Sequence, residues 1–257
     1  MVATTHATMD TAHLPGIRKV SLARPLHWLQ RGAADLGDCV PANLAHGGAM
    51  VALGWALLLM LGRHPHYVAA AVSGFLLVAP IMATGLCELS RLRAKRQPTT
   101  FDASLAVLGR SGRELFRFGL VLAGVAVAWF IVSEAMLARL FDLAYQNPAD
   151  TYWHGFLDTA SRAQWIAYIG TGAVLAAMVF ALSAVTVPAI IDARLSVSQA
   201  VRTSLRAVVT NPVPMLLWAA LITVIVAAGF ATFLLGLVVL MPLLGHATWH
   251  AYRDLVE

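Results

Sequence analysis

The feature that most constrains this chain is a run of apolar residues from Val213 to about His246. A membrane-spanning helix takes about 20 apolar residues, so this run is far too long for one crossing. We expect it to form two spans joined by a tight hairpin near Gly229. Apolar residues make up 59% of the chain and charged residues 12%, whereas soluble domains carry about 25% charged residues. The composition therefore indicates an integral membrane protein rather than a soluble enzyme.

Four further stretches are predicted to cross the membrane, at residues 44–61, 67–89, 115–137 and 164–191. The fold class is therefore predicted to be all-α, with six transmembrane helices. All but three of the 18 Lys and Arg residues lie on one side of these spans, the exceptions being Arg63, Arg139 and Arg162. Because cytoplasmic loops carry the excess of Lys and Arg, both termini are predicted to be cytoplasmic. The same placement explains the net charge of +5 without a nucleic-acid partner.

Three segments on the predicted cytoplasmic side have apolar residues at helical spacing, at residues 26–40, 101–108 and 197–208. A helix with such a face lies in the membrane interface or packs against the end of the bundle, and the pattern favours neither alternative. Each segment leads directly into a predicted span. Residues 1–24 are expected to form a flexible N-terminal tail, followed by a six-helix domain at residues 25–257.

The same segments suggest an internal repeat. The sequence SLAV at 104–107 matches SQAV at 198–201, and Pro80, Pro188 and Pro242 begin similar stretches in the even-numbered spans. We interpret the chain as three hairpin repeats, each preceded by a cytoplasmic amphipathic helix, at about residues 25–91, 100–194 and 195–254. The alternative explanation is that proline is frequent in membrane helices generally.

The candidate site is a pair of histidines near the C-terminus. His246 and His250 stand four residues apart, which places both imidazoles on one face of a helix. Zn²⁺ accepts imidazole, carboxylate and thiolate ligands, so Glu88, Asp192 or Cys39 could complete a metal site with them. The alternative, which we favour, is structural: the histidines cap the sixth span and face protein, because lipid cannot satisfy them. Their expected partners are, in order, Glu88 and Asp192, and then Asp35 or the helix around Trp28.

The sequence contains no P-loop, HExxH or GxSxG motif and no glycine-rich dinucleotide motif. We therefore assign no catalytic residue and no cofactor. The centres of the predicted spans carry no Asp, Glu, Lys, Arg or His, whereas ion-coupled transporters carry ionisable groups at membrane depth. This disfavours transport. The same lack of histidines excludes the catalytic core of a haem–copper oxidase.

Three stretches carry a resemblance to a known family: PLHWLQRGAADL at 25–36, GFLLVAPIMATGLCELSR at 74–91 and PLLGHATWHAYRD at 242–254. They resemble a bacterial family of predicted integral membrane proteins of unknown function, of which some members are labelled as cytochrome c oxidase components. The similarity runs from about residue 18 to the C-terminus. One departure is Cys87, where the family usually has tyrosine. The resemblance implies a location in the bacterial inner membrane.

These observations lead to an expected function. We expect a non-catalytic inner-membrane accessory, assembly or regulatory component of a larger membrane complex, with a respiratory cytochrome oxidase as the favoured host. Its expected partners are membrane lipids and another membrane protein. One alternative is a small transporter or channel. Another is a metal- or haem-handling protein that uses His246 and His250.

Overall fold

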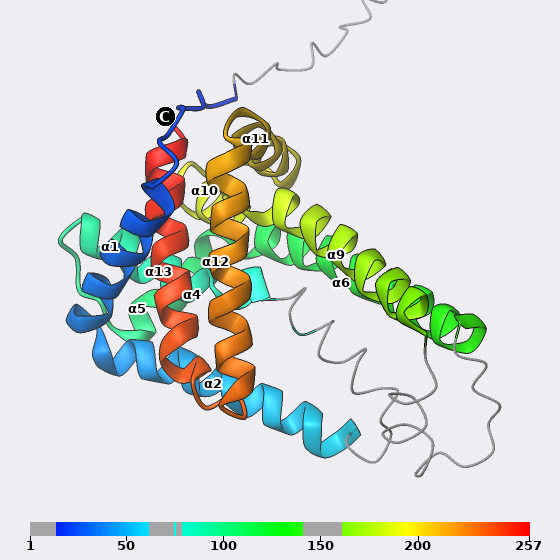
Figure 1. Cartoon of the computed structure of the whole chain (residues 1–257). Coiled ribbons are helices and arrows are strands. Elements are labelled where there is room, and N and C mark those ends of the chain that lie inside the picture. Colours follow the sequence, from blue (N-terminus) through cyan, green and yellow to red (C-terminus); the bar gives the residue numbers. More distant parts are fainter. Residues whose placement is uncertain (1–13, 62–74, 76–78, 141–160) are drawn as a thin grey trace, which may run out of the picture.

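The computed structural model describes residues 14–61, 75, 79–140 and 161–257, and its helices are shown in Figure 1. The described chain is all-α, as predicted, apart from one isolated bridge between Ile17 and Val256. The helices are α1 (Arg24–Asp38), α2 (Val40–Leu61), α4 (Thr84–Ala94), α5 (Phe101–Leu105), α6 (Val107–Leu140), α9 (Arg162–Ser183), α10 (Thr186–Asp192), α11 (Val197–Thr210), α12 (Pro212–Ala231) and α13 (Leu237–Leu255).

Among the described residues, 4 helices are long and apolar enough to cross a membrane. They are α2, α6, α12, and α9 taken together with α10, and they coincide with four of the predicted spans. The predicted span at 67–89 lies largely outside the described residues. The predicted sixth span corresponds to α13. The apolar part of this helix ends at Leu244, so it is too short to count as a membrane-spanning helix. Six spans are therefore not shown.

The helix predicted at 164–191 is broken. α9 ends at Ser183 and α10 begins at Thr186, with the backbone of Val185 outside the helical region at φ −131°. Pro188 explains the break, because proline has no N–H to donate and its ring clashes with the carbonyl group four residues earlier, here that of Ala184. The side-chain hydroxyl of Thr186, at the start of α10, donates to the carbonyl of Leu182 on α9 at 2.5 Å, across the break.

The turn between α12 and α13 comes later than predicted. Gly229 remains inside α12, and the turn follows at residues 232–236. Phe233 and Leu234 adopt the left-handed conformation there, with φ of 53° and 68°. The N–H of Leu234 donates to the carbonyl of Gly229 at 3.0 Å, which satisfies one of the orphan carbonyl groups at the end of the helix. The indole of Trp55 on α2 donates to the carbonyl of Phe233 at 3.2 Å, so the turn is tied to a third helix.

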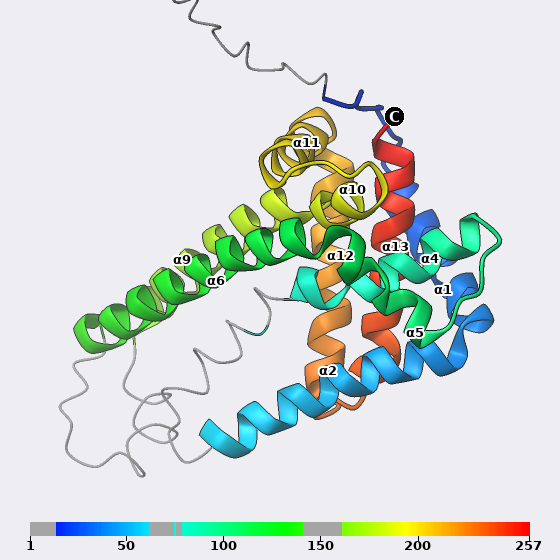
Figure 2. The ribbon, with the colours of Figure 1, turned by 180° about the vertical axis from the view of Figure 1, so that it is seen from behind.

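One end of the molecule is a closely packed group that we call the hub, made of α1, α4, α5, α10, α11 and residues 245–255 of α13. α4 lies at its centre, with Thr84 through Leu92 all buried, and contacts α13, α5 and α10. α1 runs antiparallel along the second half of α13. The antiparallel pair of α6 and α9 extends away from the hub as an arm, which is visible from both sides (Figures 1 and 2).

The two ends of the described chain meet at the hub. The N–H of Arg18 donates to the carbonyl of Leu255 at 2.9 Å, and that of Glu257 donates to the carbonyl of Gly16 at 3.1 Å. The N–H of Val20 donates to the side chain of Asn211 at 2.9 Å. Of the segment expected to be a flexible tail, residues 1–13 lie outside the described residues, and residues 16–20 lie against the C-terminus and α11.

The predicted amphipathic segments form α1, α5 with the start of α6, and α11. α1 buries Pro25, Trp28, Gly32 and Asp35, and its main neighbour is α13, so packing against the bundle is the alternative that the structure shows for this helix. The predicted equivalence of the three prolines is not visible. Pro80 comes before a turn at Ala83, Pro188 lies inside α10 and Pro242 lies inside the unbroken α13.

Replacing Gly47 with alanine is expected to lower the free energy of unfolding by about 1–3 kcal/mol. A Cβ atom at Gly47 would lie 2.7 Å from the carbonyl carbon of Val238 on α13, so α2 and α13 would have to separate. The matched control is Gly48→Ala, because no atom lies within 4 Å of a Cβ at Gly48 and alanine favours the helix. Thermal unfolding in detergent measures both variants, and equal melting temperatures would contradict the close approach of the two backbones.

Candidate functional site

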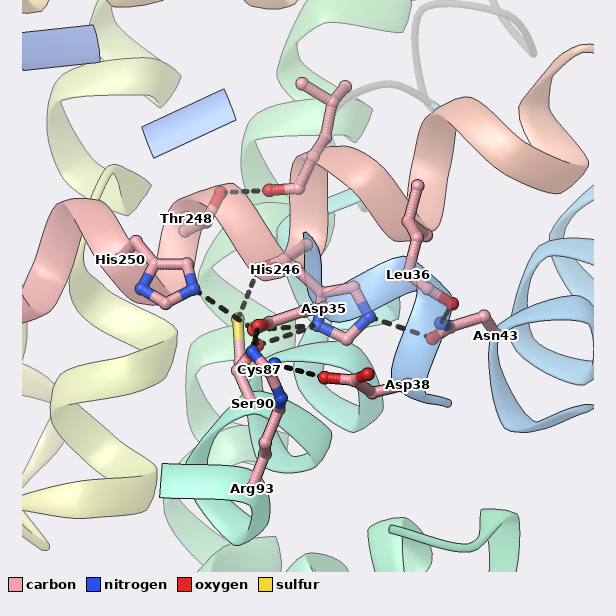
Figure 3. A network of polar contacts seen from close by, with 12 residues as sticks. Asp35, Leu36, Asp38, Asn43, Cys87, Ser90, Arg93, His246, Thr248 and His250 are labelled. Carbon is pink, nitrogen blue, oxygen red and sulfur yellow. Dashed lines mark hydrogen bonds and ion pairs between the residues drawn. The ribbon is translucent and has the colours of Figure 1, made fainter. Parts of the chain in front are cut away.

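The candidate site lies where α1, α4 and α13 meet, with a contribution from the first turn of α2. Six polar side chains converge there (Figure 3). We call them the Asp35 network, and they are Asp35, Asn43, Ser90, Arg93, His246 and His250. Asp35, Ser90 and His246 are almost completely buried. A buried group of this kind is stable only when its polar atoms have partners.

Close backbone contacts place these side chains. A Cβ at Gly32 of α1 would lie 2.9 Å from both the N atom of Ala247 and the O atom of Leu243 on α13. A Cβ at Gly245 of α13 would lie 2.5 Å from the Cβ of Leu86 on α4. Glycines at helix contacts let backbones approach closely. The first contact brings Asp35 to the histidines, and the second brings α4 with Ser90 to the same point.

Asp35 is the centre of the network. The hydroxyl of Ser90 donates to Oδ2 of Asp35 at 2.5 Å, and Nε2 of His250 lies 3.1 Å from the same oxygen atom. Arg93 forms ion pairs with the Oδ1 atom of Asp35 and with Asp38. Asp35 therefore connects α1 to α4 through Ser90 and Arg93, and to α13 through His250.

The hydrogen bonds of Asn43 determine the protonation of one nitrogen of His246. The Nδ2 group of Asn43 donates to the carbonyl of Leu36 at 3.1 Å, so its Oδ1 atom faces Nε2 of His246, at 2.8 Å. An amide oxygen only accepts hydrogen bonds, so Nε2 carries a proton. In a neutral imidazole the other nitrogen, Nδ1, is then an acceptor, and it lies 2.7 Å from the hydroxyl of Ser90. Asp35 and His246 thus both face the single hydroxyl proton of Ser90.

Burial raises the pKa of Asp35. The hydrogen bonds from His250 and Ser90, together with the electrostatic effects of His250 and His246, outweigh the burial, so this pKa lies below its usual value. A second carboxylate behaves in the same way at the other end of α1. Burial raises the pKa of Asp254, and hydrogen bonds from Arg24, Trp28 and Arg31 bring it below the usual value. The indole of Trp28 donates to Asp254 at 2.8 Å. Both carboxylates are therefore ionised at neutral pH and fasten α1 to its neighbours.

The structure does not bring Glu88 or Asp192 to the histidines. Glu88 is fully buried and accepts hydrogen bonds from Arg91 at 2.7 and 2.8 Å and from Arg110 at 2.7 Å. It lies two residues from Ser90 on α4, which places it on the opposite side of that helix.

Asp192, at the end of α10, is also occupied elsewhere. It lies 3.4 Å from Tyr252, 3.4 Å from Arg253 and 4.0 Å from Lys95. We expected Asp35 only as a second choice after these two acids, but it is the partner of His250. The prediction that His246 faces protein is confirmed, because its side chain is fully buried and both ring nitrogens have partners.

No motif marks the remaining members of the network, Asn43, Ser90 and Arg93. The signal that could have identified Asp35 is its place on the same face of α1 as Trp28 and Gly32, where a lone acid would be buried. In the part of the chain that the structure describes, no group of three or more His, Cys, Asp or Glu side chains is arranged to hold a metal ion.

Comparison with known families adds to this geometry. Residues 68–192 match the model of the family described as Predicted integral membrane protein (DUF2189). The matched segment includes α4, with Glu88, Ser90 and Arg93, but neither Asp35 nor the histidines. No curated protein and no solved structure matches the chain. Together with the four apolar helices, the family match identifies a multi-pass integral membrane protein.

Replacing Asp35 with asparagine is expected to lower the free energy of unfolding by about 2 kcal/mol. Loss of one partner of a fully buried ion pair costs about 3–5 kcal/mol, and the cost is smaller here because Arg93 is partly exposed and keeps Asp38 as a partner. The control is Asp38→Asn, whose carboxylate is about half exposed and should contribute less than about 1 kcal/mol. Thermal unfolding in detergent compares the two, and equal losses would contradict the central place of Asp35.

The contribution of Asp35 should depend on pH. Its pKa is lower in the folded protein than the value of about 3.9 expected in the unfolded chain. Its stabilising effect is therefore complete above that value and is lost as the pH falls through the folded pKa. The difference in melting temperature between the wild-type protein and Asp35→Asn should shrink as the pH falls below about 4. A difference that does not change between pH 7 and 3 would contradict this assignment.

Proposed function

We propose that the protein is a non-catalytic component of a larger membrane complex and that it binds another integral membrane protein through its spans. The hub supports the first part of this proposal. The acids nominated from the sequence are occupied by partners from the chain itself: Glu88 by two arginines, Asp192 by Tyr252 and Arg253, and Asp35 by Ser90, Arg93 and His250. Carboxylates that are held by partners from the same chain stabilise the fold.

The observation that carries the second part is the arm formed by α6 and α9. Large apolar side chains point outward along both helices, including Phe116 on α6, which is 67% exposed, and Val174 on α9, which is 73% exposed. Gly124 and Gly170 lie on the same two helices, and no atom lies within 4 Å of a Cβ at either position. Small residues let a second helix approach closely, whereas lipid chains do not require them. The arm therefore suits a partner helix.

The topology belongs to the same proposal: six spans in the bacterial inner membrane, as three hairpin repeats, with both termini cytoplasmic. The excess of Lys and Arg on one side supports this orientation. Arg139 lies in the last turn of α6 and Arg162 begins α9, so both lie at the end of the arm away from the hub. The order of elements supports the repeats, because α1, α5 and α11 each precede a long apolar helix.

Reporter fusions test this topology. Fusions after Arg63 and after Asp150 should give an extracytoplasmic signal, since both positions follow odd-numbered spans. A fusion at the C-terminus should give a cytoplasmic signal. A cytoplasmic signal at either of the first two positions would contradict the six-span topology.

Purification from native membranes tests the function. The tagged full-length chain, extracted in mild detergent, should migrate with a membrane protein in constant stoichiometry, and a respiratory oxidase is the first candidate host. The matched control is a fully solubilised preparation in a harsh detergent, in which the complex should separate. A particle containing only the 27.5 kDa chain under mild conditions would contradict the proposal.

A further inference from the structure

One face of α11 is exposed and carries both apolar and basic side chains. The helix packs against its neighbours through four small residues, Ala200, Thr203, Ser204 and Ala207, which are all buried. The opposite side, at helical spacing, exposes Arg202, Leu205, Arg206 and Val209. Val209 is 77% exposed and Leu205 is 39% exposed. A face that combines apolar side chains with arginines is typical of a helix that lies in the surface of a bilayer.

Two neighbouring apolar helices hold α11 at the level of the bilayer surface. α11 ends at Thr210, and the apolar helix α12 begins at Pro212. The hydroxyl of Ser204, in the middle of α11, donates to the carbonyl of Ala181 on α9 at 2.7 Å. Ala181 lies about 28 Å along α9 from Arg162, at about 1.5 Å per residue, and this distance is close to the hydrocarbon thickness of about 30 Å. α11 therefore lies beside the ends of both apolar helices, as Figures 1 and 2 show.

The positive charge of this face is not neutralised by the described part of the chain. α11 itself contains no Asp or Glu. Among the described residues, the side chain of Arg202 has no ion pair, and that of Arg206 donates only to a backbone carbonyl, at 3.0 Å. Glu114 lies at the start of α11, where it accepts a hydrogen bond from the N–H of Val197 at 3.0 Å, but it is already paired with Arg117 at 2.6 Å. The exposed face is therefore complementary to an anion.

We propose that the exposed face of α11 binds anionic phospholipids, with Leu205 and Val209 among the acyl chains and Arg202 and Arg206 at the phosphate groups. A guanidinium group can bind a phosphate group through two parallel hydrogen bonds. A free phosphate ion would leave the two apolar side chains in water, and a zwitterionic lipid would leave the positive charge unbalanced. This site does not depend on the proposed function, which rests on the arm.

Photo-cross-linking tests this inference with the full-length chain in nanodiscs that contain equal amounts of phosphatidylglycerol and phosphatidylcholine. A photoreactive residue replaces Val209, and mass spectrometry gives the ratio of phosphatidylglycerol to phosphatidylcholine adducts. This ratio should exceed one at Val209 and should be about one for the same residue at Val174 on α9. Each of Arg202→Gln and Arg206→Gln should lower the ratio at Val209 about fivefold, the effect of one basic residue near an anionic surface. The matched control is Arg96→Gln, on the exposed polar turn after α4, which should leave the ratio unchanged.

Two further measurements keep the result decisive. Melting temperatures show whether the variants fold, and Arg202→Gln decides if Arg206→Gln does not, because the side chain of Arg202 has no ion pair to lose among the described residues. Inorganic phosphate, added at constant ionic strength, should leave the ratio unchanged. Equal adducts of the two lipids at Val209, adducts with protein instead of lipid, or displacement by inorganic phosphate would overturn the inference. An equal loss in Arg96→Gln would also overturn it, because the attraction would then come from the net charge and not from α11.

Discussion

The structure depends on the close approach of three helices, α1, α2 and α4, to α13. α13 is approached by α1 at Gly32 and by α2 at Gly47, and its own Gly245 admits α4. At each point a side chain is missing where any other residue would hold the helices apart. The polar contacts follow from this spacing. Asp35 reaches His250, and Ser90 reaches His246, only because the backbones that carry them are already in contact.

Elementary rules located four of the six predicted spans but not the breaks in them. The crossing length is a property of the bilayer, so apolar length located α2, α6, α12 and the α9–α10 segment. Whether a proline breaks a helix depends on what surrounds it. Pro188 and Pro242 each remove one helical hydrogen bond, yet only the first accompanies a break. At Pro242 the freed carbonyl is that of Val238, which lies against Gly47 of α2, and this contact comes from a distant part of the chain.

The site was also predictable only in part. The spacing of His246 and His250 indicated a shared face, and the requirement for hydrogen bonds near lipid indicated that they face protein. The identity of their partner was not predictable, because it depends on the register of α1 against α13. The sequence analysis placed Glu88 among the first expected partners. Glu88 and Ser90 lie on opposite sides of α4, so a difference of two residues decides which of them meets the histidines. Such a register is fixed by contacts such as Gly32 with Ala247, which no local pattern reveals.

The pairing of the two chain ends has a consequence for how the protein is made. α1 leaves the ribosome first among the hub helices, while its partners on α13, and the bridge between Ile17 and Val256, come last. At a synthesis rate of about 5–20 residues per second, α1 exists for on the order of 10 to 40 seconds before α13 has been synthesised. The hub can close only after α13 has been synthesised. Until then, Trp28 lacks its hydrogen bond to Asp254, and Asp35 lacks its contact with His250.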